Sequence, residues 1–240
     1  MADKITIEVF RKKLPDELTK ALSEADSRTD IGSGAALTGA VAASYLIRAA
    51  ALTANAGESD NGERLAYLQR NGEILRSYMV HLIDEDVKCR GPLRKALREG
   101  DAVTVEAARE PAAAIANEIV NMMNQLLTLL DELSGIASPE AKRFTAAAAD
   151  LAMGAVQASM RYLLDLAAQN SDETYRYVVK RENEITLDAC RGLYAGILGK
   201  TEESSKKSGW FSAAFAGFIQ KCEILHLRLI CSIIFHQDCG

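Results

Sequence analysis

The sequence predicts an all-α protein, and three observations carry that prediction. Alanine, the strongest helix former, is abundant among the 240 residues, whereas proline occurs only four times and aromatic residues make up 6%. Apolar residues recur at three- and four-residue spacing through most of the chain. No segment alternates apolar and polar residues for long enough to predict a strand. We therefore expect a single domain of about seven to eight helices, arranged as an up-and-down bundle.

Glycine, proline and polar clusters divide the chain into the expected helices. These cover residues 5–26, 35–56, 63–89, 92–101, 102–135, 139–169, 174–198 and 210–236. Gly91-Pro92 is expected to break one helix from the next, and Pro111 to interrupt the helix that contains it. Ser138 and Pro139 fit a helix cap and a first helical residue, which predicts a helix start there. A loop is expected at 30–33.

The composition argues against several classes of protein. A net charge of −5 disfavours a nucleic-acid-binding surface, which needs basic residues. The N-terminus lacks the apolar core of a signal peptide, and no run of 18 apolar residues predicts a membrane span. The five cysteines are widely spaced and form no CxxC pair, which favours reduced thiols in a cytoplasmic protein.

Residues 201–240 differ in composition from residues 1–200, so we place a boundary between these two regions. A polar stretch, "KTEESSKKSG", is typical of a linker, and the apolar segment after it holds the only tryptophan. This segment fits a helix that packs against a partner subunit, with a membrane surface as a minor alternative. Its candidate zinc ligands lack the usual paired spacing. They are His226, Cys231, His236 and Cys239.

The stretch "TDIGSGAALTGA" at 29–40 combines a glycine-rich segment with a helix start. Free N–H groups at Gly32, Ser33 and Gly34, together with the helix dipole, would favour an anionic ligand. The stretch is neither a Walker loop, because GK[ST] is missing, nor a dinucleotide fingerprint, because the GxGxxG spacing fails. The alternative is structural, since the small residues that follow allow another helix to approach closely.

The order of further landmarks carries a family resemblance. After the glycine stretch and an alanine-rich helix come "LIDEDVKCRGPLRKAL", "EAAREPAAAIANEIVNMMNQLL", a Ser-Pro helix start and "MGAVQASMRYLL". This order resembles the cyclodeaminase/cyclohydrolase family, which comprises the cyclodeaminase part of formiminotransferase-cyclodeaminase and its stand-alone bacterial relatives. The resemblance covers roughly residues 5–200.

The resemblance implies an all-helical fold that assembles into homodimers or rings of dimers. It also implies a tetrahydrofolate derivative as the substrate. From the charge, the hydropathy and the spacing of possible ligands we expect no nucleic acid, no membrane span and no metal. Family members close N5-formimino-tetrahydrofolate to the 5,10-methenyl form with loss of ammonia, or interconvert methenyl and formyl forms using water.

The family's acidic segment matches Asp84 and Asp86, which are the best candidates for moving a proton. Two residues apart on one helix, they diverge by about 200° and cannot face one pocket. Family position favours Asp86 as the catalytic residue. Local geometry favours Asp84 or His81, which share a helix face with Glu85. The alternative is a solvated helix end; a metal site is disfavoured because no second ligand cluster is visible.

Ligand binding is expected at the glycine stretch and at two further places. Gly32, Ser33 and Gly34 would form the rim of the pocket. Asn121, on one helix with Asn124 and Gln125, would line a polar wall, and Lys142, beside Arg143, would meet the glutamate tail of the folate. Buried hydrogen-bonding pairs and an ordinary surface pair are the alternatives for these two places.

Several family residues are replaced in this chain. Ser33 stands where the family has glycine and Ala35 where it has serine, and an aspartate and two asparagines of the third landmark are absent. Two hypotheses follow. The chain is either a one-carbon folate enzyme or a catalytically altered paralogue that serves as a small-molecule binding or assembly protein. The retained acidic segment favours the enzyme.

Overall fold

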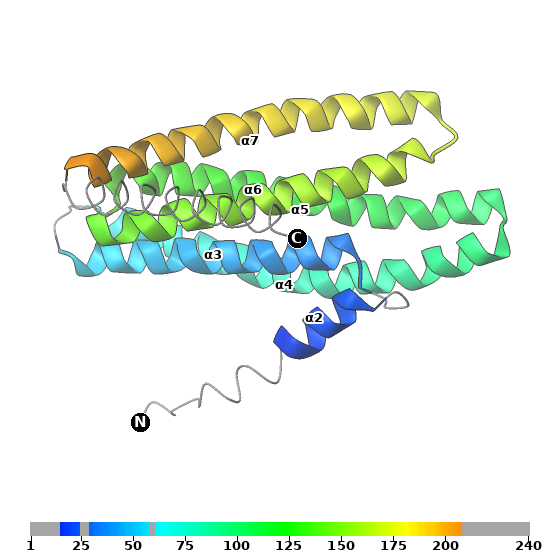
Figure 1. Cartoon of the computed structure of the whole chain (residues 1–240), viewed down its shortest axis with the longest axis horizontal. Coiled ribbons are helices and arrows are strands. Elements are labelled where there is room, and N and C mark those ends of the chain that lie inside the picture. Colours follow the sequence, from blue (N-terminus) through cyan, green and yellow to red (C-terminus); the bar gives the residue numbers. More distant parts are fainter. Residues whose placement is uncertain (1–14, 25–28, 58–60, 208–240) are drawn as a thin grey trace, which may run out of the picture. The chain divides into compact units, whose positions relative to one another are not determined.

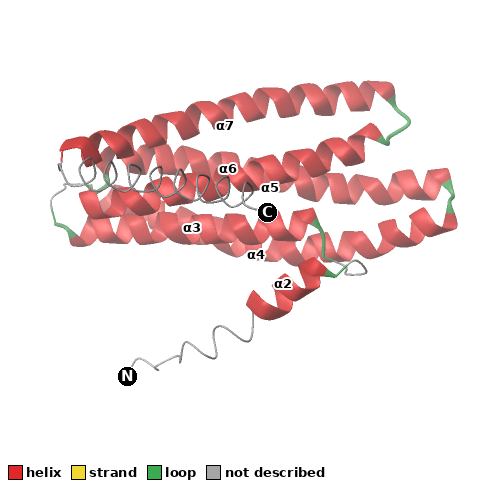
Figure 2. Ribbon diagram, viewed as in Figure 1, coloured by secondary structure: helices red, strands yellow, loops and turns green. Residues whose placement is uncertain are grey.

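The computed structural model describes residues 15–24, 29–57 and 61–207. Within these ranges the chain is helical apart from short connections (Figure 2), which confirms the all-α prediction. The described helices are α2 (Pro15–Ser23), α3 (Ile31–Asn55), α4 (Gly62–Glu99), α5 (Ala102–Ile136), α6 (Pro139–Ala168) and α7 (Glu173–Lys207).

Two predicted helix breaks are wrong, which lowers the number of helices. Pro92 lies inside α4 and Pro111 inside α5. A proline in a helix removes one backbone hydrogen bond, and here packing compensates for it. Leu93 follows the first proline and Ala112 follows the second, and both side chains are buried.

The expected loop at 30–33 is also wrong, because α3 already begins at Ile31. Asp30 caps this helix, with its side chain accepting a hydrogen bond from the N–H of Ile31. Gly32 and Ser33 therefore belong to the first turn of a helix rather than to a loop. The predicted start of α6 is confirmed, with Ser138 as the cap and Pro139 next to it.

Residues up to 198 contain a helical bundle built around α3. This helix packs against α4, α5 and α6. The short connections alternate between the two ends of the bundle, so consecutive helices from α3 to α7 run antiparallel (Figure 1). The core side chains between the helices are fully shielded from solvent, among them Leu46, Met79, Met123, Leu126 and Leu130.

Helix α3 is poor in bulky residues because its neighbours lie very close to it. A Cβ atom on Gly39 would overlap the terminal methyl group of Met79 and press on Met123. By length and hydropathy, α3 is the one helix in the described part of the chain that is apolar enough to cross a membrane. Half of its most apolar 18-residue stretch is buried inside the bundle.

Helix α7 contributes Cys190 and Ile197 to the same core. The Tyr194 hydroxyl donates a 2.6 Å hydrogen bond to Asp150 on α6. Burial raises the pKa of the Cys190 thiol to about 11, so this thiol is protonated at neutral pH. Helix α7 continues beyond the predicted end at 198, and its last residues, 199–207, belong to a second compact unit.

Some predictions fall on residues that the structure does not describe. They concern residues 5–14 of the first expected helix, the apolar segment 210–236 and the four histidines and cysteines weighed there as zinc ligands. The division of the chain at residue 200 stays a prediction.

Candidate functional site

Asp86 of α4 is a buried carboxyl group held by the first turn of α3. Its side chain is only 2% exposed. One carboxylate oxygen accepts a 2.9 Å hydrogen bond from the N–H of Ser33 and a 2.5 Å bond from the Ser33 hydroxyl. The other lies so close to Gly32 that a Cβ atom there would overlap it. Gly32 and Ser33 thus form a cradle for Asp86.

The surroundings of Asp86 favour its protonated form. Burial raises the pKa of Asp86 most strongly, because a charged carboxylate loses its hydration. The two Ser33 hydrogen bonds oppose this rise, the negative charge of Asp30 adds to it, and Arg90 weakly opposes it. A carboxyl group with a raised pKa holds its proton closer to neutral pH, as a general acid requires.

Two further charged residues and a tyrosine lie beside this cradle. Asp30 forms a 2.7 Å ion pair with Arg90, which follows Asp86 by one turn of α4. Tyr162 of α6 is also buried. Its burial, followed by the charges of Asp30 and Asp86, raises the Tyr162 pKa, so the phenol stays protonated. Three helices therefore contribute polar groups to one small region.

A cavity of about 340 Å³ adjoins the Asp30–Arg90 ion pair. Gly34 faces it with room to spare, since a Cβ atom there would meet Leu22 only at 3.8 Å. The lining residues are Leu22, Glu24, Thr29, Asp30, Ile31, Gly34, Arg90 and Arg94. Arg94 also lines a larger, open groove of about 750 Å³ that carries Lys88, Lys95 and Arg98. The polar region thus adjoins a basic surface of α4.

The other acid–base candidates lie away from this cradle. Asp84 is exposed, as its two-residue offset from Asp86 predicts. His81 is exposed as well, and its Nε2 lies 3.5 Å from Glu85, which also pairs with Lys88 at 2.6 Å. The structure therefore brings Gly32, Ser33 and Asp86 together and leaves His81 and Asp84 on the solvent side of α4.

The two remaining candidates for ligand binding are also separated from the cradle. Asn121 is exposed on α5. Lys142 lies in the first turn of α6, next to the end of α3, where the Ser138 N–H donates to the Thr53 hydroxyl at 3.2 Å. Thr53 follows Ser33 by twenty helical residues, a rise of about 30 Å.

Sequence reasoning missed Asp30, Arg90 and Tyr162 as neighbours of Asp86. Asp30 precedes a helix start, and Arg90 follows Asp86 by four residues, so their positions carried a local signal. Tyr162 carried none, because only the packing of α6 brings it close.

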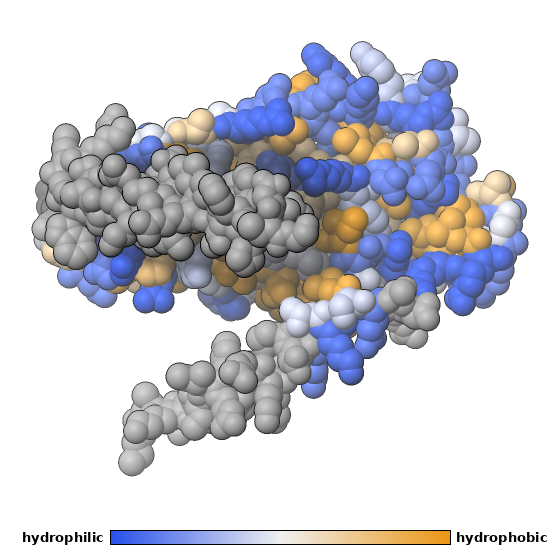
Figure 3. All heavy atoms as spheres, viewed as in Figure 1, coloured by the Kyte–Doolittle hydropathy of each residue, from blue (hydrophilic) through white to orange (hydrophobic). Residues whose placement is uncertain are grey.

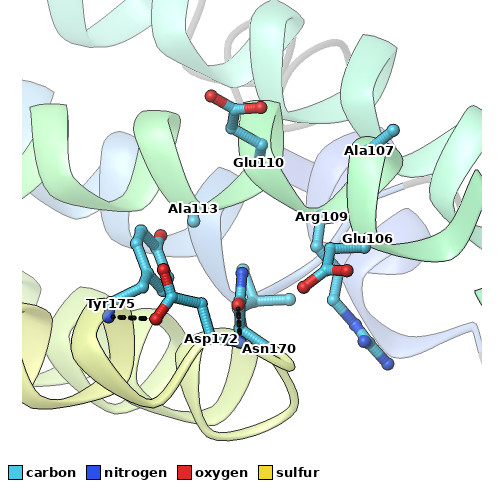
Figure 4. Close-up of a pocket in the computed structure, with 9 residues that line it drawn as sticks. Glu106, Ala107, Arg109, Glu110, Ala113, Asn170, Asp172 and Tyr175 are labelled. Atoms are coloured by element: carbon cyan, nitrogen blue, oxygen red, sulfur yellow. Dashed lines mark hydrogen bonds between the residues drawn. The ribbon is translucent and has the colours of Figure 1, made fainter. Parts of the chain in front are cut away.

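A second cavity, of about 290 Å³, lies where α5 meets the turn before α7 (Figure 4). Several of its polar side chains hold that turn in place. Glu106 accepts hydrogen bonds from the N–H and hydroxyl of Ser171, and Arg109 donates to Gln169. Asp172 accepts from the N–H groups of Thr174 and Tyr175 at the start of α7. These contacts suit a helix cap better than a ligand site.

The described residues contain no group of three or more histidine, cysteine, aspartate or glutamate side chains placed to hold a metal ion. The Asp86 region itself carries carboxyl, hydroxyl, guanidinium and phenol groups.

Comparison with known proteins places this fold. A family model described as formiminotransferase-cyclodeaminase matches residues 16–184. The crystal structure of formiminotetrahydrofolate cyclodeaminase from Thermotoga maritima aligns with a TM-score of 0.75 at 20% identity, over 81% of this chain and 98% of that chain. No curated protein sequence matches this chain. The structural likeness shows a shared fold, and the family model covers well over half of the sequence. The chain therefore belongs to the formiminotransferase-cyclodeaminase family.

Proposed function

We propose that this chain is an enzyme of one-carbon folate metabolism that acts on formimino- or methenyl-tetrahydrofolate. Formimidoyltetrahydrofolate cyclodeaminase activity is the first candidate and methenyltetrahydrofolate cyclohydrolase activity the second. The observation that carries the proposal is Asp86, a buried carboxyl group with a raised pKa. It occupies the position of the family's acidic segment and lies against the glycine stretch.

Ring closure needs a proton to move. N10 attacks the formimino carbon, the new C–N10 bond forms, and the bond to the departing nitrogen breaks to release ammonia. The N10 proton must leave, and the departing nitrogen must gain one. An acid with a raised pKa can supply the second proton and accept the first, and such transfer contributes about 10²–10⁴-fold to a rate.

The surroundings of Asp86 supply binding groups for such a substrate. In this proposal the reacting end of the folate enters the cavity beside Asp30 and Gly34, and the glutamate tail lies along the groove that begins at Arg94. Carboxylates of the tail would pair with its cations. Lys142, about 30 Å away along α3, is a weaker candidate for this role within one chain.

The deciding experiment is an assay with purified full-length protein. 5-Formimino- and 5,10-methenyl-tetrahydrofolate are each added, and methenyl absorbance is followed with EDTA present, because the proposal includes no metal. We expect turnover of at least one substrate and a loss of about 10²–10⁴-fold in Asp86→Asn. Asp84→Asn should stay within a few fold of wild type.

The control is Asp165→Asn, which removes an exposed carboxylate from α6 and should leave the rate unchanged. Turnover no faster than buffer with both substrates would overturn the enzyme proposal. Full activity in Asp86→Asn would remove Asp86 from the proposed catalytic role.

The alternative is a catalytically altered paralogue that binds a small molecule or supports an assembly. The near-complete burial of Asp86 and the replacement of family residues at Ser33 and Ala35 favour it. Under this alternative a folate would bind, measured by calorimetry, but neither substrate would turn over.

We further propose that the chain is cytoplasmic and acts as a homodimer or a ring of dimers. Large apolar side chains are exposed on several helices, including Ile74, Val103, Tyr177 and Ile185. Figure 3 shows apolar surface lying among charged side chains on one face. Light scattering coupled to gel filtration would test the proposed assembly. A monomeric mass of 26.0 kDa at assay concentration would contradict it.

A further inference from the structure

Arg90 is the cation placed to neutralise Asp86, yet it is paired with a different carboxylate. Residues four apart on a helix are neighbours, so Arg90 lies one turn from Asp86 on the same face of α4. Its guanidinium instead forms a 2.7 Å ion pair with Asp30, at the start of α3. Asp86 keeps only the two hydrogen bonds from Ser33.

Asp30 is itself fixed in place from two directions. It accepts a 2.9 Å hydrogen bond from the N–H of Ile31, because it caps α3. Tyr162 of α6 lies near enough that the Asp30 charge helps to raise the pKa of its phenol, after the larger effect of burial. The cap and the ion pair together hold the Asp30 carboxylate beside Arg90.

We propose that Asp30 is a positioning residue, which holds the Arg90 guanidinium away from Asp86 and so leaves Asp86 able to carry a proton. Its negative charge near Asp86 acts in the same direction, since a second carboxylate disfavours ionisation of the first.

Charged and titratable groups lie near Asp86 on three helices. Helix α3 and its cap contribute Asp30, α4 contributes Arg90 and the Cys89 thiol, and α6 contributes Tyr162. Helix α5 contributes only uncharged side chains to the buried cluster that contains Tyr162, namely Ala112, Ala113 and Ala116, with Ala108 packed against it. Arg90 is thus the positive charge whose position can change the charge state of Asp86.

The importance of this arrangement for catalysis rests on the proposed function, but its test does not. The protonation of Asp86 can be followed by NMR in full-length protein that carries ¹³C-labelled aspartate. The Asp86 signal is assigned by its loss in Asp86→Asn. A protein without folate activity would still titrate, so failure of the proposed function and failure of this inference are separate results.

Two single substitutions should move the Asp86 titration in opposite directions. Asp30→Asn removes one negative charge and frees Arg90, so the midpoint should fall by about one pH unit or more, as for a carboxylate close to a cation. Asparagine is as good a helix cap as aspartate, so α3 should form normally. Arg90→Gln removes the cation and leaves Asp30 unpaired, so the midpoint should rise.

Matched controls separate this effect from a general change in charge. Asp165→Asn and Arg70→Gln remove exposed charges from α6 and α4 and should leave the midpoint unchanged. The double variant Asp30→Asn/Arg90→Gln should titrate between the two single variants. If the protein is active, the alkaline limb of its pH–rate profile should move with the NMR midpoint while circular dichroism stays unchanged.

Two outcomes would overturn the proposal. One is an unchanged or higher Asp86 midpoint in Asp30→Asn. The other is an unchanged or lower midpoint in Arg90→Gln, which decides the matter even if Asp30→Asn does not fold.

Discussion

The first turn of α3 packs closely against a carboxyl group. Seven residues later, the same helix packs equally closely against two methionine side chains. Gly32 lies against Asp86, and Gly39 lies against Met79 and Met123. Both glycines are in regular helix, and neither has a positive φ. In both places the absence of a Cβ atom allows a neighbouring helix to bring a side chain up to the backbone.

The difference lies in what the neighbours bring. Around Gly39 the contacts are apolar and the energy comes from close packing. Around Gly32 the neighbour is a carboxyl group that has lost its water, so it needs hydrogen bonds from Ser33. A row of small residues therefore predicts close approach, and the chemistry of the approaching residue decides between packing and a site.

The largest effect is expected from a methyl group at Gly32, which tests whether this glycine serves the site. Gly32→Ala would push the Asp86 carboxylate out of its cradle, and a displacement of about 1 Å can cost about 100-fold in rate. We expect that loss in the methenyl absorbance assay. Gly192→Ala on α7 is the matched control, because nothing lies within 4 Å of a Cβ atom there, and it should keep nearly full activity. Equal losses in the two variants would show that an added methyl group affects the helices in general and not the cradle.

The next largest effect is expected for Ser33→Ala, which removes the hydroxyl hydrogen bond to Asp86. Removing a hydrogen-bond partner from a buried polar group costs about 1–3 kcal/mol, so the free energy of unfolding should fall by that order at neutral pH. Urea unfolding measures it. Ser44→Ala removes a hydroxyl bonded only to the Ala40 carbonyl of its own helix, and it should cost less. A larger loss in Ser44→Ala would contradict the special role of Ser33.

In the middle of α3 a methyl group should cost stability but not activity. Gly39→Ala would meet the flexible ends of Met79 and Met123, which can move, and it also gains about 1 kcal/mol of helix propensity. Because overpacking costs about 1–3 kcal/mol, we expect a net loss of about 1 kcal/mol in urea unfolding. Adding Met79→Leu, which removes the overlapping methyl group, should restore part of it. A loss of activity without a loss of stability would show that this region belongs to the site.

Much of this fold could be predicted from the sequence, because its periodicity and caps are local signals. The start of α6 at Ser138-Pro139 and the small-residue face of α3 are examples. The breaks at Pro92 and Pro111 were predicted wrongly. A proline costs one hydrogen bond, and the sequence alone does not reveal that Leu93 and Ala112 are buried well enough to offset it.

The candidate site could be predicted only in part, for the same physical reason. The helical offset of Asp84 and Asp86 correctly separates one exposed carboxylate from one buried one. The contact between Asp86 and Ser33 joins residues 53 positions apart, and Tyr162 comes from a third helix. Lys142 carried a suitable charge, yet the packing of α6 places it beside the far end of α3.

The smallest expected change is in how the stability of the protein depends on pH. The test is whether the Tm of wild type falls or rises relative to that of Asp86→Asn as the pH rises. The pKa of Asp86 is raised in the folded protein and is about 4 in the unfolded chain. At any pH between these two pKa values, the native state binds more protons than the unfolded state. Stability from this group is therefore lost as pH rises through that window. Asp86→Asn, which carries no titrating group, should have a higher Tm than wild type at neutral pH, and the difference should shrink as the pH approaches 4.

Thermal unfolding of both proteins from pH 4 to 8 measures this difference, and all other titrating groups cancel in it. Met79→Leu, at the apolar region of α3, provides the contrast, because its effect on Tm should not depend on pH. A wild-type protein that becomes more stable than Asp86→Asn as the pH rises would mean that Ser33 and Arg90 outweigh burial. Asp86 would then be an ionised structural anchor at neutral pH, and the first turn of α3 would serve packing just as the middle of the helix does.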